Sequence, residues 1–259
     1  MTKTQRTKPI LRWPGGKSRL LKTILPMIPP HVCYCEHFCG GVATLLAKER
    51  SSVEVINDFN GNLVALYRNL QFHLPALLGE LEWLFTSRQN FHDFVAQPGL
   101  TELQRAARFL LVNRTSFGGG MHSFGVSKTK GGGIGFDHTK ISNLLGAAHE
   151  RLNGVVVENL PFERSFKNYD SKDTFHFIDP PYQNAPTGAY DGWDEKQLQH
   201  FRREVGKLKG QWIVTLNDSP FTRELFAGCN VKAVVSENRA VNRRTHAEQK
   251  FGELIITKS

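Results

Sequence analysis

The spacing of apolar residues along the chain changes between two periods, and this change predicts that strands alternate with helices. Short β-branched or aromatic runs predict strands at 33–38, 53–57, 155–157, 175–178, 212–216, 231–235 and 254–256. Apolar residues at helical spacing predict helices over 42–48, from Leu63 to Leu74 and from Leu198 to Leu208. The order strand, helix, strand at the start of this series is typical of a doubly wound α/β sheet.

The middle of the chain follows a helical pattern instead. Thr101 and Gln104 form a predicted capping box ahead of an apolar helix that carries Leu110 and Leu111. After this helix, two glycine triplets at 118–120 and 131–133 predict an exposed hairpin or mobile loop. We therefore predict a sheet domain made of residues 1–74 and 151–259, interrupted by a mostly helical insertion at 75–150.

The charge balance favours a polyanionic partner. Lys and Arg total 33 against 24 Asp and Glu, which gives a net charge of +9 and a pI of about 9.5. No acid precedes Glu36, although seven Lys and Arg residues lie between Lys3 and Lys22. A solvated basic arm without a ligand is the alternative interpretation of this stretch.

Several classes of protein are disfavoured by the same sequence. Four cysteines without framework spacing, together with an N-terminus that lacks an apolar signal segment, predict reduced thiols in a cytoplasmic protein. No run of 18 apolar residues predicts a membrane span. His31, Cys33, Cys35, His37 and Cys39 alternate on one predicted strand, a spacing that suits a closed tetrahedral zinc site poorly, so we expect no metal. A phosphate-binding loop ending at Gly16-Lys17-Ser18 would need a glycine where Leu11 stands.

The strongest chemical signal is Asp179-Pro180-Pro181-Tyr182, which follows directly on a predicted buried strand. The carboxyl edge of a parallel sheet is where α/β folds bind ligands. Asp179 and the Pro180 carbonyl are adjacent hydrogen-bond acceptors, and the two prolines remove N–H donors and stiffen the loop. Such a loop suits an exocyclic amine, a poor nucleophile that must be oriented. An Asp-Pro turn that merely ends a strand is the alternative interpretation.

Tyr182 adds an aromatic face on which a base can stack. An amine inside duplex DNA is inaccessible until its nucleotide swings out of the helix, so a stacking residue in the pocket is expected.

These elements together resemble the Dam-type, D12-class adenine-specific DNA methyltransferases along nearly the whole chain. The resemblance implies a class I methyltransferase-like fold with a helical DNA-recognition insertion, S-adenosylmethionine as cofactor and double-stranded DNA as partner. Arg12-Trp13-Pro14-Gly15-Gly16-Lys17 is similar to the N-terminal Trp-x-Gly-Gly-Lys element of the family. The resemblance implies these cofactor contacts: Trp13, Lys17, Phe38, Cys39, Gly40, Gly41, Asp58 and Asp179.

Two segments depart from the pattern of the family. The common glycine turn reads Phe-x-Gly-x-Gly, whereas here Val42 takes the last position and the second glycine comes one residue early. Arg114-Thr115-Ser116-Phe117 stands where Dam-type enzymes carry a tyrosine-rich stretch, which argues against GATC as the target.

Basic residues near the glycine-flanked loop and before the last strand are the predicted DNA contacts, since Lys and Arg hold phosphates and a protruding loop can reach base edges. They are Asn113, Arg114, Lys128, Lys130, Arg243 and Arg244. A surface loop with incidental charge is the alternative.

The sequence thus predicts N6-adenine methylation of a flipped-out base in a short DNA target. The same acceptor loop would serve an N4-cytosine DNA methyltransferase or an RNA adenine methyltransferase. A catalytically silent DNA-binding regulator would show the same basic balance. The sequence leaves open whether a cognate restriction nuclease accompanies the protein.

Overall fold

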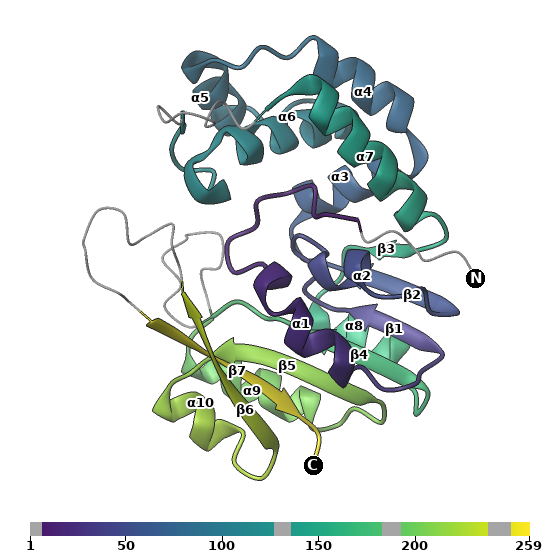
Figure 1. The fold of residues 1–259 in the computed structure, drawn as a ribbon, viewed down its shortest axis with the longest axis vertical. Coiled ribbons are helices and arrows are strands. Elements are labelled where there is room, and N and C mark those ends of the chain that lie inside the picture. The colour runs from purple at the N-terminus through teal and green to yellow at the C-terminus, as the bar shows by residue number, and fades with distance from the viewer. Residues whose placement is uncertain (1–6, 127–135, 183–192, 238–249) are drawn as a thin grey trace. The chain divides into compact units, whose positions relative to one another are not determined.

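The computed structural model describes residues 7–126, 136–182, 193–237 and 250–259 (Figure 1). The chain forms two compact units, each made of three segments. The helical unit comprises Met1–Pro26, Gly40–Arg50 and Asp58–Asn159, and the sheet unit comprises Met27–Cys39, Ser51–Asn57 and Leu160–Ser259. These units cross the predicted boundaries at 74 and 151, and the predicted functional division into catalytic domain and insertion stays a prediction.

The sheet unit holds six of the seven strands of a mostly parallel sheet, in the order β2-β1-β4-β5-β7-β6. The strands are β1 (Cys33–Glu36), β2 (Val53–Asn57), β4 (Thr174–Ile178), β5 (Gln211–Asn217), β6 (Asn230–Glu237) and β7 (Lys250–Thr257). The four neighbouring strands β2, β1, β4 and β5 are parallel to one another. Strand β7 is antiparallel to both β5 and β6. The predicted doubly wound, mostly parallel sheet is confirmed.

Apolar side chains explain why these strands lie at the centre of the sheet unit. Every residue of β4 is buried, as expected for a strand covered on both faces. Three helices complete the unit: α8 (Phe162–Tyr169), α9 (Glu195–Val205) and α10 (Pro220–Leu225). Phe166 of α8 and Phe201 of α9 join residues of β4, β5 and β7 in one buried hydrophobic cluster. Leu208, predicted to lie on the α9 helix, follows its end but packs in the same cluster.

The helical unit is built mainly from α3 (Gly61–Phe72), α4 (Leu74–Glu82), α5 (Arg88–Ala96), α6 (Glu102–Thr115) and α7 (His138–Leu152) (Figure 1). Shorter elements are η1 (Lys17–Arg19), α1 (Leu21–Ile24), α2 (Ala43–Ala47), η3 (Phe117–Gly119) and the strand β3 (Val156–Glu158). The predicted capping box of α6 is confirmed, because the Thr101 side chain accepts from the Gln104 backbone and the Gln104 side chain accepts from the Thr101 backbone.

One predicted helix of this unit is divided in two. The leucine stripe from Leu63 to Leu74 predicted a single helix, but α3 ends at Phe72 and Leu74 begins α4. Pro75 explains the break, because proline has no backbone N–H to continue a helix and favours the first turn of a new one. Among the described residues, no helix combines the length and the apolar character that crossing a bilayer would require.

Candidate functional site

The parallel strands of the sheet unit end at a common edge. In the pairing register, Glu36 of β1 lies opposite Ile56 of β2 and opposite Phe177 of β4. The carboxyl ends of β1, β2 and β4 are therefore level with one another to within one or two residues. Gly40 follows β1 by four residues, while Asp58 and Asp179 follow β2 and β4 directly. Ligands of doubly wound folds bind at this carboxyl edge.

The glycine turn after β1 is shaped around Trp13. Gly40 has a φ of +45°, and a Cβ placed on it would lie 2.7 Å from Nε1 of Trp13. A Cβ at position 41 would lie 3.2 Å from the Cβ of Trp13, which is a tight contact. The indole thus occupies the space that a side chain at position 40 would need, which explains Gly40. Tyr67 of α3 fixes the turn from the other direction, because its hydroxyl donates to the Gly40 carbonyl at 2.6 Å.

Val42 stands where the common glycine turn has its last glycine, and its backbone conformation is one that favours glycine. Its φ is +47°, a left-handed backbone that β-branched residues rarely adopt. The side chain is buried, with 1% of its surface exposed, and it immediately precedes α2. Packing of this side chain therefore offsets a backbone cost of about 1 to 2 kcal/mol.

Asp58 is held by backbone N–H groups. Its Oδ2 accepts from the Gly40 N–H at 3.0 Å, and its Oδ1 accepts from the Asn60 N–H at 2.9 Å. Burial raises the pKa of Asp58 above its usual value, although these backbone hydrogen bonds oppose the rise. A carboxylate that closes a glycine turn after the second strand is suited to accept hydrogen bonds from ribose hydroxyls.

Lys17 lies in η1, and only 4% of its surface is exposed. Its ammonium donates to the Gly15 carbonyl at 2.6 Å. A buried ammonium is costly unless anions or acceptors surround it. The Gly15 carbonyl is one such acceptor, and the predicted contact of Lys17 with a cofactor stays a prediction.

The residues between β1 and the glycine turn point into the sheet unit. The ring of Phe38 lies 5.6 Å from that of Phe162 and 5.5 Å from that of Trp193, between ring centroids. Cys39 is buried, and its backbone N–H donates to the carbonyl of Asn57. Both residues support the turn at its start, and their predicted contact with a cofactor stays a prediction.

Asp179 accepts a hydrogen bond from a side chain of the neighbouring strand. The hydroxyl of Thr215, on the neighbouring strand β5, donates to Oδ1 of Asp179 at 2.7 Å. Asp179, Pro181 and Tyr182 are half-buried and Pro180 is buried, so the loop combines support with access. Thr215 itself is fully buried.

Tyr182 packs partly against the hydrophobic cluster of the sheet unit. Its pKa is raised well above the usual value, first because its hydroxyl is buried and then because the negative charges of Asp179 and Glu253 lie nearby. The tyrosine therefore stays neutral, and its predicted role in stacking on a base stays a prediction.

The predicted DNA contact at Asn113 needs a correction. The side chain is fully buried, its Oδ1 accepts from the Arg12 N–H at 2.9 Å, and its Nδ2 donates to the carbonyls of Arg12 and Gly119. The amide of Asn113 therefore holds the backbone at Arg12 and at Gly119. We reassign Asn113 from a DNA contact to a residue that supports these two segments. Gly119 fits only without a side chain, since a Cβ there would overlap the Arg12 carbonyl.

Two arginines, Arg12 in the N-terminal segment and Arg114 in α6, and the aromatic ring of Phe117 lie beside the backbone that Asn113 holds. The guanidinium of Arg12 donates to the Arg114 carbonyl at 3.3 Å. Partial burial, and then the neighbouring positive charge of Arg12, lower the pKa of Arg114. Phe117, at the start of η3, has 66% of its surface exposed. Sequence reasoning missed Arg12 and Phe117 as candidates. Phe117 follows Arg114 by three residues, which was a usable signal, whereas only the fold brings Arg12 to Arg114.

Four predicted DNA contacts lie outside the described residues. They are Lys128, Lys130, Arg243 and Arg244. Of the predicted hairpin at 113–135, the described part contains an antiparallel bridge between Ser116 and Phe124.

A buried chain of polar groups lies beneath the sheet edge. His37 Nδ1 and the Ser165 hydroxyl are 2.8 Å apart, His37 Nε2 and His176 Nδ1 are 2.8 Å apart, and His176 Nε2 is 3.2 Å from Asp170 Oδ1. Burial lowers the pKa of His37 well below its usual value and lowers that of His176 to about 4, although Asp170 opposes the second shift. Within the described residues, no group of three or more histidines, cysteines or acids is arranged to hold a metal ion.

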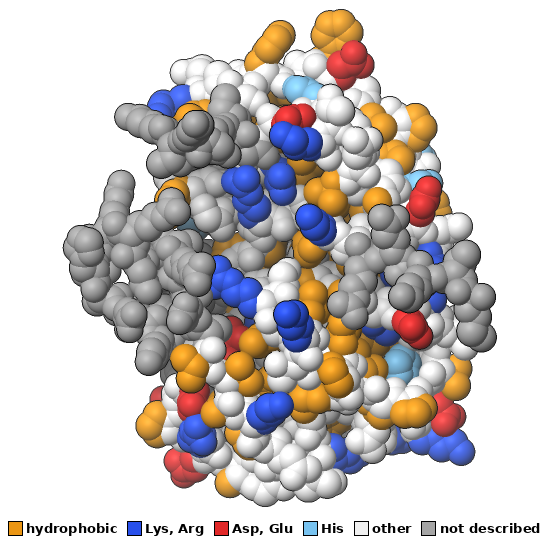
Figure 2. All heavy atoms as spheres, in the orientation of Figure 1, with side chains coloured by type: hydrophobic (Ala, Val, Ile, Leu, Met, Phe, Trp, Pro, Cys, Tyr) orange, Lys and Arg blue, Asp and Glu red, His pale blue; other side chains and the backbone are white. Residues whose placement is uncertain are grey.

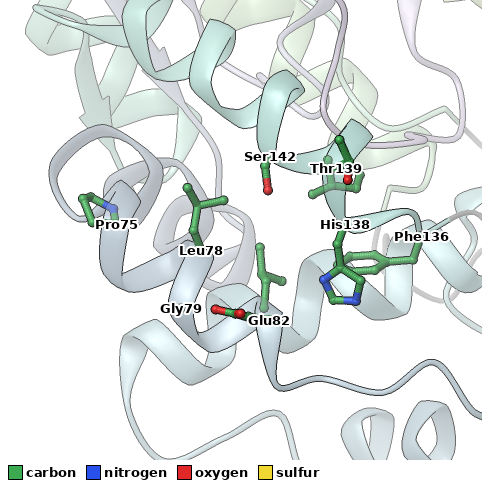
Figure 3. Close-up of a pocket in the computed structure, with 10 residues that line it drawn as sticks. Pro75, Leu78, Gly79, Glu82, Phe136, His138, Thr139 and Ser142 are labelled. Atoms are coloured by element: carbon green, nitrogen blue, oxygen red, sulfur yellow. The ribbon is translucent and has the colours of Figure 1, made fainter.

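The helical unit also contains a pocket of about 470 Å³ between α4 and α7 (Figure 3). Leu78 and Glu82 line it from α4, and His138, Thr139 and Ser142 line it from α7. None of the predicted site residues lines this pocket.

The mostly parallel sheet covered by helices is the class I-like α/β fold that methyltransferases use, and the glycine turn and the loop after β4 each carry a carboxylate that the sequence predicted for such a site. The chain belongs to the D12 class N6 adenine-specific DNA methyltransferases, since the model of that family matches residues 13–241. The protein is therefore an adenine-specific DNA methyltransferase, as the sequence predicted.

Curated relatives of about the same length agree with this family. The chain is 25% identical over 229 residues to the type II methyltransferase M.CviBI of Paramecium bursaria Chlorella virus NC1A, an alignment that covers 85% of this chain and 87% of the relative. It is 27% identical to the type II methyltransferase M.MjaIII of Methanocaldococcus jannaschii, with 91% and 93% covered. It is 25% identical to the DNA adenine methylase of Haemophilus influenzae, with 96% and 92% covered.

Proposed function

We propose that the chain uses S-adenosylmethionine to methylate the N6 amine of an adenine flipped out of double-stranded DNA, with Asp179 and the Pro180 carbonyl binding the amine. The observation that carries this proposal is the place of Asp179, which directly follows β4 at the carboxyl edge of the sheet and is oriented by a hydrogen bond from Thr215. Membership of the family supports the reaction, and the roles of the individual residues are proposed from their geometry.

The helical unit supplies a donor and acceptor set that fits the cofactor. Asp58 would accept the ribose hydroxyls, the ammonium of Lys17 would pair with the carboxylate of the methionine part, and Trp13 would form an apolar wall. The fit rests on the chemistry of this set: the buried carboxylate of Asp58, held by the Gly40 and Asn60 N–H groups, lies at the glycine turn against which Trp13 packs. S-adenosylmethionine, when bound, supplies a methyl group on a sulfonium, an electrophile that needs no further activation.

The loop after β4 prepares the nucleophile. Asp179 and the Pro180 carbonyl accept the two N–H groups of the amine, which draws the nitrogen lone pair out of the ring and directs it to the methyl carbon. With S-adenosylmethionine held by these residues, the amine nitrogen would form its bond to the methyl carbon as the C–S bond breaks with its electron pair left on sulfur, and the surplus proton of the amine would leave to solvent. Orientation of this kind can contribute roughly 7 to 11 kcal/mol to catalysis.

Residues of the helical unit would hold the DNA. Arg12 and Arg114 place two positive charges side by side, an arrangement that a phosphate would stabilise. Phe117 offers an exposed ring on a loop stiffened by Asn113, and such a ring can fill the gap that a flipped base leaves. Figure 2 shows further basic side chains gathered on the visible face of the helical unit.

The test combines one substitution with identification of the product. Unmethylated plasmid DNA is incubated with the protein and S-adenosylmethionine, digested to nucleosides and analysed by mass spectrometry. We expect N6-methyladenine from the native chain and none from Asp179→Ala, with unchanged circular dichroism. Asp173→Ala, which alters an exposed carboxylate just before β4, is the matched control and should retain activity. An active Asp179→Ala would refute the assigned role.

A further inference from the structure

The carboxyl end of β5 adds a residue to the site that the loop motif does not contain. Strands β4 and β5 are parallel, and Ile178 pairs with Val214. The next residues in each strand direction are Asp179 and Thr215, so the sheet register itself sets these side chains opposite one another. The resulting hydrogen bond, from the Thr215 hydroxyl to Asp179 Oδ1, measures 2.7 Å.

Thr215 is well suited to orient a carboxylate. It is fully buried, and β5 is bordered by β4 on one side and β7 on the other, so its backbone is fixed. A β-branched side chain is stiff about χ1, which leaves its hydroxyl little freedom. Hydrogen bonds to charged acceptors inside a protein are also stronger than neutral ones. The plane of the Asp179 carboxylate is therefore set by a residue 36 positions further along the chain.

We propose that Thr215 is a positioning residue that acts on the methyl transfer through Asp179. The inference rests on the proposed role of Asp179. A nucleophile must be aligned with the methyl carbon and sulfur, and a displacement of about 1 Å can cost on the order of a hundredfold in rate. Losing the Thr215 hydroxyl removes one of the contacts that orient the carboxylate, so the effect should fall on the rate of transfer and leave cofactor binding unchanged.

Two substitutions of similar size separate the hydroxyl from packing. Thr215→Val keeps the shape and removes the donor, whereas Thr215→Ser keeps the donor and removes a methyl group. We expect kcat on unmethylated plasmid DNA to fall roughly 10- to 100-fold in Thr215→Val, with the Kd for S-adenosylmethionine and the thermal midpoint close to native. Thr215→Ser should retain kcat within about threefold.

Two results would overturn the positioning role of Thr215. If Thr215→Val keeps kcat within twofold, or if Thr215→Ser loses as much as Thr215→Val, the positioning role is wrong. Asp179→Ala is measured in parallel: an active Asp179→Ala overturns the proposed function, whereas an inactive Asp179→Ala beside a native-like Thr215→Val overturns this inference alone.

A separate observation concerns Asn217, two residues beyond Thr215. Its side-chain oxygen is buried and has no hydrogen-bond partner within the residues that the structure describes. Alternate residues of a strand face the same side, so Asn217 shares the face of Thr215 at the end of β5. A buried acceptor without a partner lowers the free energy of unfolding, and such groups are retained mainly where they have a function.

We infer that the Asn217 oxygen acts as a partial negative charge beside the target amine during methyl transfer, in addition to the two acceptors that take its N–H groups. The nitrogen gains positive charge as its bond to carbon forms, so this dipole stabilises the transition state more than the ground state. The side chain would thus raise kcat more than it lowers KM for DNA.

The substitution Asn217→Leu tests this with two readouts of opposite sign. Leucine has a similar size and no polar atoms, so we expect kcat to fall about tenfold while the thermal midpoint stays level or rises. A purely structural asparagine would give the reverse pattern, with a lowered midpoint and native kcat, and that result would overturn the inference.

Discussion

The two carboxylates that follow parallel strands, Asp58 and Asp179, are supported in opposite ways. Asp58 belongs to the helical unit and is held by the backbone N–H groups of Gly40 and Asn60. Asp179 belongs to the sheet unit and is held by the side chain of Thr215. A carboxylate held by backbone depends on a backbone shape, and therefore on glycine. A carboxylate held by a hydroxyl depends on the identity of one distant residue.

The largest expected effect separates the two carboxylates by kinetic parameter. Asp179→Asn should lower kcat by about a thousandfold, because it removes the charge that draws on the amine lone pair. Asp58→Asn should raise the Kd for S-adenosylmethionine roughly 10- to 100-fold through weaker hydrogen bonds to the ribose, with a smaller change in kcat at saturating cofactor. Isothermal titration and steady-state methylation measure both. An equal loss of cofactor binding in both variants would contradict the separate roles of the two carboxylates.

The next effect tests the dependence of Asp58 on glycine. In Gly40→Ala the new Cβ would lie 2.7 Å from the Trp13 indole, on a backbone with a φ of +45°. We expect a loss of roughly 3 to 4 kcal/mol in the free energy of unfolding, from the left-handed backbone and the overpacking together. Urea unfolding measures it.

Gly79→Ala is the matched control for this loss. Gly79 lies inside α4 and has nothing within 4 Å of an added Cβ, so alanine should stabilise the protein by about 0.5 to 1 kcal/mol. Equal effects at both glycines would contradict the explanation given for the turn at Gly40.

The smallest of the three effects concerns acid. His176 is fully buried and its pKa is lowered to about 4, so it binds a proton more weakly in the folded chain than in the unfolded chain. The stability it contributes is complete above about pH 6.5 and is lost as pH falls towards 4, amounting to about 3 kcal/mol. The lowered pKa of His37 acts in the same direction.

Urea unfolding at pH 7.5 and pH 4.5 measures this loss. Part of the difference should vanish in His176→Gln, which carries no titrating ring at this position, and the part that His37 contributes should remain. An acid dependence that is unchanged in His176→Gln would assign the loss to other groups.

Much of the fold could be predicted because local patterns agree with the tertiary structure. The β-branched run of β2 and the capping box of α6 are local signals that packing does not override. The break at His73 was missed because the leucine spacing continues across it, whereas the backbone effect of Pro75 decides the helix boundary. Asn113 was misjudged because a polar residue beside arginines is typical of a surface, and only the fold shows it buried.

The candidate site was predicted in its motifs and missed in its supports. Asp58 and Asp179 stand directly after predicted strands, so chain order alone locates them. Helix packing brings Tyr67 to the Gly40 carbonyl, and sheet register brings Thr215 to Asp179. Neither contact can be predicted from the residues that are adjacent in the chain. Both supports come from neighbouring elements, which is why pattern reasoning could not find them.

The clamp that Asn113 makes on Arg12 has a further consequence. Arg12 is bonded to the loop that carries Phe117, and Trp13, the very next residue, lies against Gly40. A single peptide bond thus joins the wall of the proposed cofactor cradle to the anchor of the proposed DNA loop. Ordering either end restricts the other, so occupancy by one ligand should tighten the affinity for the other by the same factor in both directions.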